Sequence, residues 1–385
     1  MAAPARILHA HSTFSLGGKE ARAVRLMNAF GGTARHTVLS GMPGQLSARD
    51  AISPAIAADF PTDAPPLTGR PDPLRLLRLA RYMRGFDLVL TYNWGAFDMV
   101  LARRLYGGVM TLPPLIHHED GFNEDEAAGL KPRRNLARRI GLPAAHRLVV
   151  PSARLEGIAR DVWRQRPQRV KRIANGIAVS RYAAKPSPDA IPGLIQREGE
   201  VVIGTVAGLR KVKNLPRLVR AFAAMKARNC RLVIVGEGPE RAAVAAEVAR
   251  LGVASRVHLP GFLHDPARWI GRFDIFALSS DSEQFPISLV EAMAAGLPAV
   301  ATAVGDISAM LPADNLPLIV DPADEAAFAA ALDSLAQRPD LRRAIGRANR
   351  EMAVADYDEA AMIDRYARLY GEAIGAPRAF LPASA

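Results

Sequence analysis

Apolar runs alternate with amphipathic segments along most of the chain. Short apolar runs are typical of strands buried in a parallel sheet, and apolar residues three or four positions apart are typical of helices that cover one. The alternation stops in the polar, proline-containing stretch Tyr182–Gly199 and restarts at Val201–Ala207. We therefore predict two α/β domains joined by a linker, each with a parallel sheet covered by helices. Two such domains that face each other would leave a cleft for a ligand.

The same pattern predicts where the strands and helices lie. Residues 42–73, rich in proline, alanine and aspartate, are predicted to be irregular. The final helix follows the last predicted strand and therefore needs another surface to pack on. The predicted strands are 6–11, 36–40, 88–92, 115–118, 147–150, 170–173, 201–207, 231–235, 257–259, 275–278 and 299–301. The first predicted helix follows Glu20 and ends at about Phe30. The other predicted helices are 73–84, 97–106, 133–140, 152–163, 216–227, 240–251, 287–295, 324–337, 339–352 and 358–371.

The stretch Asp281–Thr302 joins two of the predicted strands through a short helix, with a proline suited to its start and a glycine suited to its end. The unpaired N–H groups of the first helical turn, from about Phe285 to Leu289, form a site for an anion. Glu283 precedes this turn and Glu291 follows it, and their carboxylates suit hydroxyl donors. A nucleotide sugar carries both phosphate and hydroxyl groups.

Three further strand-to-helix loops have residues suited to phosphate. Gly17-Gly18 and the turn Gly236–Pro239 would let the backbone approach a ligand closely. Arg210 and Lys213 bring cations to a third loop. A simple tight turn and a solvated loop fit the same residues about equally well. Neither glycine turn supplies the full dinucleotide fingerprint, which argues against an NAD-dependent oxidoreductase.

The predicted strand Leu115–His118 ends in the sequence His117-His118-Glu119-Asp120. Ligands of open α/β sheets bind at the carboxyl ends of the strands, so His118 and Asp120 are placed where chemistry could occur. Histidine, glutamate and aspartate are residue types that ligate metals. Because no second cluster stands at matched spacing, we expect no metal site.

The 385 residues, 49% of them hydrophobic, are enough for two domains with a core each. Cys230 is the only cysteine, which excludes an internal disulfide and fits a reducing cytosol. No apolar run is long enough to span a bilayer, and the N-terminus lacks a signal pattern. We therefore expect a cytoplasmic protein.

The net charge of +12 comes entirely from the first half of the chain. Residues 1–180 hold 26 Lys and Arg against 14 Asp and Glu, whereas residues 181–385 hold 24 of each. The densest part is Lys131–Arg172, with 13 basic residues and only two acidic ones. Such a surface attracts anionic lipid, nucleic acid or phosphorylated substrates, although a solvated face would look the same.

A second basic segment is the predicted helix Pro73–Arg84, which has an apolar stripe and an adjoining basic face. Such a helix can lie on an anionic membrane surface, but more often it packs its apolar side chains inward. Few aromatic residues interleave with the basic ones in this half, which disfavours a nucleic-acid partner. The basic face comprises Arg75, Arg78 and Arg81.

Several segments, taken in order, resemble the retaining glycosyltransferases of family 4. The likeness covers nearly the whole chain and is strongest over residues 201–310. It implies the GT-B fold, with two facing Rossmann-like domains at 1–180 and 200–356, a linker at 181–199 and a deep interdomain cleft. It also implies that the helix of the C-terminal segment 357–385 crosses back onto the N-terminal domain. The segments are Gly17-Gly18-x-Glu20, Asn175-Gly176-Ile177, Arg210–Asn214, Val235-Gly236-x-Gly238-Pro239 and the E-x7-E pair Glu283–Glu291.

The resemblance implies a role for each matching residue. Glu283 would accept hydrogen bonds from hydroxyls of the transferred sugar, and Glu291 would bind the ribose. Lys213 and Arg210 would neutralise the diphosphate, and His118 matches a histidine whose backbone or ring meets the donor sugar. The predicted catalytic residues are Glu283, His118, Lys213 and Arg210. The predicted donor site comprises Gly17, Gly18, Asp120, Arg210, Lys213, Gly236, Phe262, Glu283, Phe285, Pro286, Ile287, Ser288, Leu289 and Glu291.

The chain departs from the family pattern at four positions. Gln284 stands where glycine usually follows the first glutamate, and Leu209 follows Gly208 where arginine is common. Asp306 replaces the second glycine of a pair, and Ala309 replaces a common glutamate. These differences bear on donor choice, whereas the E-x7-E pair is kept.

The resemblance implies transfer of a sugar, with UDP-sugars favoured, to an acceptor hydroxyl with retention of the anomeric configuration. We expect no metal or other cofactor and no nucleic-acid partner. The acceptor would be a glycolipid, a lipid-linked compound or a cell-envelope polysaccharide precursor, reached at the inner face of the cytoplasmic membrane through the basic N-terminal half. The alternatives are a sugar-nucleotide epimerase of the same build and a basic, non-enzymatic protein that binds nucleic acid or other anions.

Overall fold

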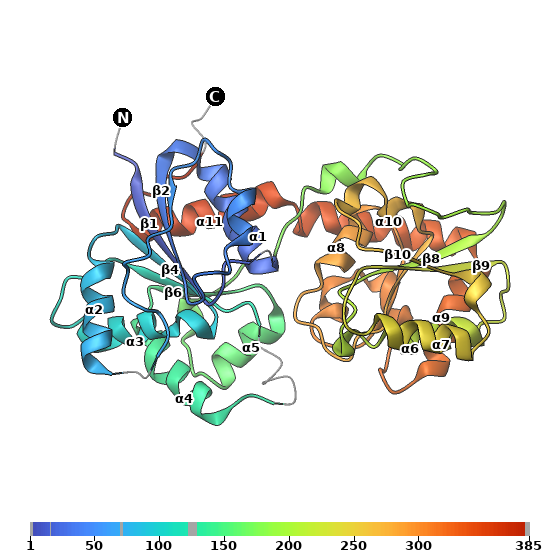
Figure 1. Ribbon diagram of the computed structural model, residues 1–385, viewed down its shortest axis with the longest axis horizontal. Helices are drawn as coiled ribbons and strands as arrows, with labels where there is room; N and C mark the ends of the chain where they lie inside the picture. Colours follow the sequence, from blue (N-terminus) through green and yellow to red (C-terminus); the bar gives the residue numbers. More distant parts are fainter. Residues whose placement is uncertain (1–2, 16, 70–71, 122–128, 382–385) are drawn as a thin grey trace. The chain divides into compact units, whose positions relative to one another are not determined.

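The chain folds into two compact units in the computed structural model, which describes residues 3–15, 17–69, 72–121 and 129–381. The first unit contains the chain up to Asn175 together with the residues from Ala360 onward, and the second contains Gly176–Glu359. Each unit consists of strands flanked by helices (Figure 1). The last helix belongs almost entirely to the first unit, which supplies the packing surface that its position in the sequence requires.

The first unit is built on a parallel sheet with the strand order β3-β2-β1-β4-β5-β6-β7. The order reverses between β1 and β4, which makes a topological switch point at their carboxyl ends. Its strands are β1 Ala5–His11, β2 Ala34–Ser40, β3 Ala58–Asp59, β4 Leu88–Tyr92, β5 Leu115–His118, β6 Arg147–Val150 and β7 Val170–Arg172. Its helices are α1 Gly18–Phe30, α2 Pro73–Met83, α3 Phe97–Tyr106, α4 Pro132–Gly141, α5 Ala153–Asp161 and α11 Glu359–Ala373.

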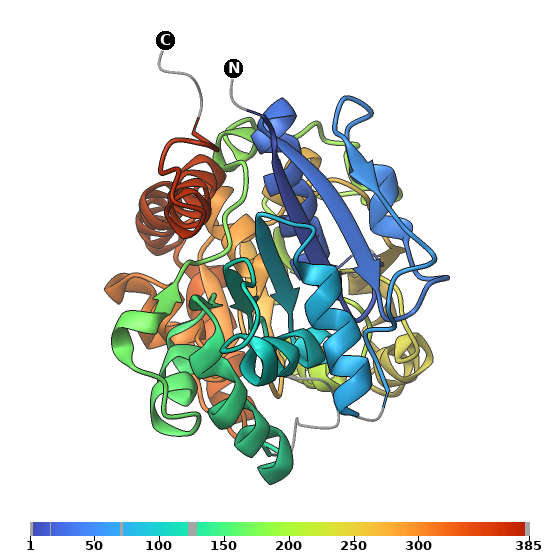
Figure 2. The ribbon, with the colours of Figure 1, turned by 90° about the vertical axis from the view of Figure 1, so that its left-hand side faces the viewer.

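Helices cover both faces of this first sheet. Successive residues of a strand point to opposite faces, so each strand contributes to two apolar layers. Ile7 and Leu90 lie in the layer shared with α1 and α11, and Leu8 and Val89 lie in the layer shared with α2, α3 and α5. Figure 2 shows the red helix α11 on one side of the blue and teal strands and the blue-green helices α2 and α3 on the other.

The second unit repeats this plan with the strand order β10-β9-β8-β11-β12-β13, again parallel throughout. Its core packs apolar residues of the sheet, such as Ile234 and Val300, against α6, α7 and α9. Its strands are β8 Val201–Val206, β9 Cys230–Val235, β10 Val257–Gly261, β11 Ile275–Leu278, β12 Ala299–Thr302 and β13 Ile319–Val320. Its helices are α6 Leu215–Ala224, α7 Arg241–Arg250, α8 Ile287–Ala294, α9 Glu325–Gln337 and α10 Pro339–Asp356.

The stretch predicted to be a linker, 181–199, packs within the second unit. It has little regular structure, but Tyr182, Ile191 and Leu194 are buried there. These apolar side chains do not follow the spacing of a helix or a strand. The prediction of a linker therefore rested on the polar residues and prolines between them. The structure places the boundary between the units next to Asn175 instead.

Helix α2 corrects the prediction of a three-arginine basic face. Arg78 and Arg81 are exposed, but Arg75 is buried and pairs with Asp98. The Arg75 guanidinium also donates to the carbonyl oxygens of Pro66 and Leu67, at 3.2 and 3.3 Å. Arg75 therefore ties the segment before α2 to the first unit and does not contribute to a surface charge.

Within the described residues, every helix is either too short or too polar to cross a lipid bilayer.

Candidate functional site

The strand order of the second sheet reverses between β8 and β11, and the loops that follow these two strands lie side by side. The Asp281 N–H donates to the Val212 carbonyl oxygen at 2.8 Å, and the Asn214 side-chain amide donates to both Asp281 carboxylate oxygens at 3.1 Å. Arg217 of α6 adds an ion pair to Asp281 at 2.8 Å. A topological switch point is the usual ligand site of such sheets. Here hydrogen bonds and an ion pair join the two loops that form it.

Glu283 and Lys213 meet at this switch point. The Lys213 Nζ lies 2.5 Å from Glu283 Oε1, and the Ser280 Oγ donates to the same oxygen at 2.6 Å. The Glu283 side chain is only 8% exposed, whereas that of Lys213 is 24% exposed. The pair therefore places one buried carboxylate and one accessible cation, both predicted site residues, in direct contact.

Helix α8 begins just beyond Glu283, and among the described residues its N-cap position has no side-chain cap. Its N-cap residue is Pro286, and the Leu289 N–H bonds back to the Pro286 carbonyl oxygen at 3.1 Å. The earlier N–H groups of a helix have no partner within it, so Ile287 and Ser288 present donors to a ligand or to water. Pro286 has no N–H and can contribute only its position.

Glu291 lies one turn further along α8. Its Oε1 accepts a hydrogen bond from the Tyr182 hydroxyl at 3.2 Å. Burial, followed by the neighbouring Glu291 charge, raises the pKa of Tyr182 well above its usual value, so the hydroxyl stays a donor. The sequence did not reveal this contact of Tyr182 with a predicted site residue, because Tyr182 stands in the stretch predicted to be a linker.

Two glycines allow the loops around the switch point to touch through their backbones. Gly236 has a φ of 143°, and a Cβ there would stand 1.9 Å from the Ala207 carbonyl oxygen. Gly305 has a φ of 61°, and a Cβ there would stand 2.0 Å from the Glu283 carbonyl oxygen. Gly236 thus belongs to the frame of the loop after β8, and Gly305 supports the backbone of Glu283 itself.

The remaining predicted residues of the second unit lie around these loops with fewer contacts. Arg210 is exposed, and no described residue pairs with its guanidinium. Phe262 is 61% exposed and contacts the His264 ring edge to face. The Phe285 ring packs near Tyr357, with 5.8 Å between the ring centres. Gln284 has its Oε1 buried without a partner among the described residues.

In the first unit, Gly17 and Gly18 stand at the amino end of α1, after β1 and beside the switch point of that sheet. A Cβ on Gly18 would meet no described atom within 4 Å. Packing within the unit therefore does not require glycine at residue 18. Neighbouring Glu20 is buried and pairs with Lys19.

Asp120 lies in the first unit, where its carboxylate is held by Arg22. The Arg22 guanidinium binds both carboxylate oxygens, with Nη2 at 2.8 Å from Oδ2, and also donates to Asn175 Oδ1 at 2.8 Å. The Asp120 N–H donates to Asn93 Oδ1 at 2.7 Å. If the Asp120 carboxylate bound the donor, it would do so while also paired with Arg22. The sequence pattern did not reveal that Arg22 is buried.

The ring of His118, a predicted site residue, is buried inside the first unit. The ring is 1% exposed, stacks on Tyr92, and has its Nε2 at 2.8 Å from the Tyr370 hydroxyl and its Nδ1 at 3.3 Å from the Thr91 carbonyl oxygen. Its backbone carbonyl accepts from the Asn93 N–H at 2.8 Å. Burial lowers the pKa of His118 well below its usual value. His118 therefore fastens α11 to the sheet, because its side chain points inward from the last position of β5.

His11, a residue that the sequence analysis did not single out, continues this stack. Its ring lies parallel to Tyr92, with 4.0 Å between the ring centres, and both ring nitrogens are buried without a partner among the described residues. Burial, with the nearby Lys19 and Arg22 charges, lowers the pKa of His11 well below its usual value. The carboxyl ends of β1, β4 and β5 are thus closed by stacked neutral rings.

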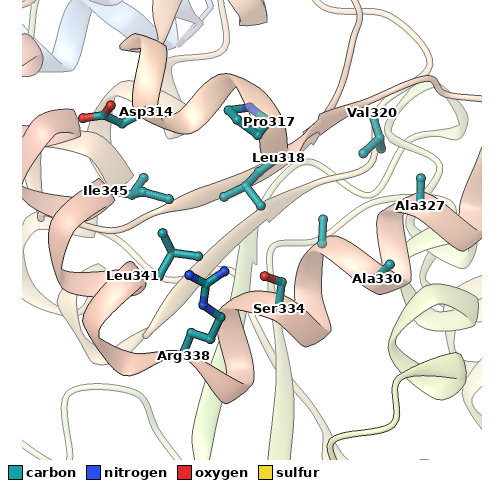
Figure 3. Close-up of a pocket in the computed structure, with 11 residues that line it drawn as sticks. Asp314, Pro317, Leu318, Val320, Ala327, Ala330, Ser334, Arg338, Leu341 and Ile345 are labelled. Atoms are coloured by element: carbon teal, nitrogen blue, oxygen red, sulfur yellow. The ribbon is translucent and has the colours of Figure 1, made fainter.

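Two other features of the described residues bear on chemistry. No three His, Cys, Asp or Glu side chains in the described part of the chain gather where they could hold a metal ion, so His117–Asp120 do not form such a cluster. A cavity of about 450 Å³ lies between α9, α10 and the segment before β13, lined by Leu318, Leu341 and Ile345 (Figure 3). None of the predicted site residues lines it.

Part of the chain matches a known protein family. Residues 189–352 match the model of the family described as Glycosyl transferases group 1. N-acetyl-alpha-D-glucosaminyl L-malate synthase of Bacillus anthracis is 28% identical over 174 residues, which are 45% of this chain and 46% of that protein. Lipopolysaccharide core biosynthesis glycosyltransferase LpsD of Rhizobium meliloti is 27% identical over 193 residues, 50% of this chain and 55% of that protein. The chain thus spans about half the length of these curated relatives.

Solved structures resemble the chain over nearly its whole length. Anabaena Alr3699/HepE in complex with UDP has a TM-score of 0.77 at 19% identity, covering 95% of this chain and all of the other. WaaG, a glycosyltransferase involved in lipopolysaccharide biosynthesis, has a TM-score of 0.63 at 16% identity, covering 98% of this chain and all of the other. At such low identity the likeness shows the fold alone, and it confirms the predicted GT-B fold of two parallel-sheet, Rossmann-like domains.

Proposed function

We propose that the chain transfers a sugar from a nucleotide diphosphate sugar to an acceptor hydroxyl, because residues 189–352 match the model of the glycosyl transferases of group 1. The observation that carries this proposal is the contact between Lys213 and Glu283, 2.5 Å apart, directly before the uncapped amino end of α8. A cation, a carboxylate and free N–H groups at one switch point match the diphosphate and the sugar hydroxyls of such a donor.

In the proposed reaction, the residues of the second unit stabilise the departing diphosphate. Lys213, the exposed Arg210 and the first-turn N–H groups of α8 are donors whose positions are set before the reaction begins. Preorganised donors stabilise charge that develops in the transition state without the cost of reorienting water. The same set neutralises the diphosphate without a metal ion, and we therefore keep metal independence as part of the proposal.

Glu283 has a different task, which is to position the sugar. Its Oε1 already accepts from Lys213 and Ser280, so a sugar hydroxyl would take the place of the Lys213 ammonium when the diphosphate draws that ammonium away. An ionised acceptor forms hydrogen bonds roughly twice as strong as a neutral one. Glu291, which already accepts from Tyr182, is assigned to the ribose.

We assign the transfer to the retaining class. The bond between the anomeric carbon and the phosphate oxygen breaks while the acceptor oxygen bonds to the same face of that carbon. The acceptor proton passes to the leaving phosphate oxygen, so no side chain acts as nucleophile. The buried, already bonded His118 ring is not required for this scheme.

The relatives guide the choice of donor and acceptor. The solved HepE complexes contain UDP and UDP-glucose, and the named relatives LpsD and WaaG serve lipopolysaccharide biosynthesis. We therefore assign a UDP-sugar donor and a glycolipid, lipid-linked or other cell-envelope acceptor. The basic first half of the chain would meet such an acceptor at the inner face of the cytoplasmic membrane.

The proposal is tested by a thermal-shift screen of the protein against UDP-, GDP- and ADP-sugars, followed by NMR of the products. A donor that binds only the folded state raises the melting temperature. The expected result is stabilisation by UDP-sugars and a product with the anomeric configuration of the donor. Conversion of the donor to an isomer without an acceptor would indicate an epimerase, and stabilisation by no nucleotide sugar would contradict the proposal.

A further inference from the structure

Helix α4 turns apolar side chains toward the solvent. Leu136 is 58% exposed and Ile140 is 50% exposed. They are four residues apart, so they lie on one side of the helix, one turn above the other. Pro132, a further four residues back, is exposed as well. The outward side of α4 therefore has an apolar stripe over its whole length.

Among the described residues, the inward side of α4 packs only the small residue Ala137 on the core and is held otherwise by polar contacts. Arg138 is 1% exposed and binds the Glu119 carboxylate through Nε at 2.9 Å and Nη2 at 3.2 Å. Its guanidinium also lies over the rings of Trp94 and Trp163, 5.3 and 4.9 Å from their centres. Asn135 adds a hydrogen bond of 3.0 Å from the Trp163 indole N–H.

This arrangement is the reverse of an ordinary surface helix, which buries its apolar stripe and exposes its polar side. The buried ion pair and the two indole rings hold α4 in place, so Leu136 and Ile140 are not needed to pack the helix on the first unit. Two large apolar side chains kept at the surface indicate a partner outside the folded chain.

The charge around the stripe indicates which partner. Arg133 and Arg139 are exposed beside it, and no described residue pairs with either. Both lie in the segment 131–172, which has 13 basic residues and two acidic ones. A basic helix with an apolar stripe suits the boundary between anionic headgroups and acyl chains, because the arginines meet phosphate groups while leucine and isoleucine enter the apolar layer. A nucleic acid would bind the arginines but would leave the apolar stripe exposed to water.

We propose that the outward side of α4 is a docking surface for an anionic phospholipid membrane. Leu136 and Ile140 insert at the acyl boundary, and Arg133 and Arg139 bind the lipid phosphates. This inference rests on the proposed membrane-side acceptor and names the element of the chain that reaches the lipid. It can be tested without donor or acceptor, so its failure would leave the sugar-transfer proposal standing.

The first test is flotation of the full chain with vesicles of phosphatidylcholine alone or mixed with phosphatidylglycerol. The expected result is recovery with the mixed vesicles only. The double variant L136S/I140S should lower partitioning by about tenfold, since it removes most of the inserted apolar surface. The matched control is I195S/V354S, which changes two exposed apolar residues of the second unit, 79% and 54% exposed, and should float like the wild type.

The second test is the charge variant R133Q/R139Q, compared with R343Q/R347Q on α10 of the second unit. Each arginine near an anionic surface strengthens binding by about fivefold, so the α4 variant should lose about twenty-five-fold and the α10 variant little. Melting curves from circular dichroism check that all four variants are folded. Equal flotation with neutral vesicles, or wild-type flotation of L136S/I140S, would overturn the proposal. If L136S/I140S floats normally and R133Q/R139Q does not, the surface is a plain cation patch that would suit nucleic acid.

Discussion

Glu283 connects the two loops of the candidate site, the loop after β8 through Lys213 and the loop after β11 through Ser280. One of its carboxylate oxygens accepts from Lys213 at 2.5 Å and from Ser280 at 2.6 Å. The Ser280 carbonyl oxygen in turn accepts from the Thr302 hydroxyl at 2.6 Å, which ties the loop after β11 to the end of β12. The carboxylate is therefore held before any substrate arrives, and its effect on sugar transfer can be separated from its effect on nucleotide binding.

The variant E283Q keeps the shape of the side chain and removes its charge. We expect kcat/KM for the donor to fall by about a hundredfold, because a charged acceptor for the sugar hydroxyl is lost, while the affinity for UDP alone stays close to that of the wild type. Steady-state kinetics and calorimetric titration with UDP measure the two quantities. A parallel loss of UDP affinity would show that Glu283 holds the nucleotide and not the sugar.

Ser280 offers a milder test of the same carboxylate. The variant S280A removes one hydrogen bond to Glu283 and should lower kcat/KM by about tenfold, which corresponds to about 1.4 kcal/mol. Because Ser280 positions a charge and is not expected to touch the substrate, S280T should recover much of the activity. If S280T is as impaired as S280A although its melting temperature is unchanged, the positioning role is contradicted.

At the scale of whole elements, the loops of the second unit are joined backbone to backbone. Gly236 has a φ of 143° and leaves no room for a Cβ beside the Ala207 carbonyl oxygen, whereas Gly18 at the start of α1 has open space. These two glycines occupy similar strand-to-helix turns in the two units. At Gly236 the protein itself needs the space, whereas at Gly18 packing within the unit does not.

The pair G236A and G18A separates these two reasons for glycine. G236A should lower the free energy of unfolding by about 2 kcal/mol or more, since it combines a strained backbone with a clash. G18A should leave stability unchanged or slightly higher, because alanine favours a helix, and should weaken binding of the nucleotide sugar. Chemical denaturation and donor titration measure both. Normal donor affinity in a folded G18A variant would remove Gly18 from the site.

Most strands and helices could be predicted from the sequence, and the exceptions have physical causes. The central strands are continuous apolar runs, so their positions were predictable. The edge strands β3 and β13 have only two residues each, too few to show a pattern. His118 stands at a strand end that suggested chemistry, but the alternation of side chains along β5 turns its ring inward beneath α11, where Tyr370 meets it.

The candidate site could be predicted only in part, because some of its contacts join residues that are distant in the sequence. Glu283 and Lys213 stand in loops with a recognisable order of residues, and the structure brings them together. The partners Ser280, Tyr182 and Arg22 were not evident, since each acts through a contact that the local pattern does not encode. Arg75 and Arg138 are buried through partners distant in sequence, so counting charges along the chain overestimated the exposed basic surface.

At the scale of the whole molecule, burial of neutral histidines in the first unit makes stability depend on pH. Burial lowers the pKa of His36 to about 4 and those of His9, His11 and His118 well below the usual value of about 6.5. The unfolded chain binds protons at these histidines from about pH 6.5 downward, whereas the folded chain does not. Stability is therefore complete above about pH 6.5 and falls as the pH drops toward the folded-state pKa values.

Urea denaturation at pH 7.5 and 5.5 measures this effect. Each such histidine costs at most about 1.4 kcal/mol per pH unit over this range, so several together should lower the free energy of unfolding by a few kcal/mol. The variant H36Q should reduce the pH dependence, and H264Q, which changes an exposed histidine of the second unit, should not. Equal stability at both pH values would show that these histidines become protonated in the folded state.

The two units carry separate parts of the proposed activity. The second unit contains the cation, the carboxylates and the open helix end that suit a nucleotide sugar, and the first contains the basic, outwardly apolar helix α4 that suits a lipid surface. Each part can be removed by substitution without touching the core of the other unit, so donor binding and membrane binding should be lost independently. The central claim concerns the second unit alone.

The most direct test of that claim is calorimetric titration of UDP into the wild type, K213A and the control R347A, whose exposed arginine lies on α10 of the same unit. Loss of the Lys213 ammonium should weaken UDP binding by about ten- to a hundredfold, as expected for a charge-assisted contact to phosphate, while R347A should bind UDP like the wild type. Equal affinity of K213A and the wild type for UDP would contradict the assignment of the nucleotide to the β8–β11 switch point.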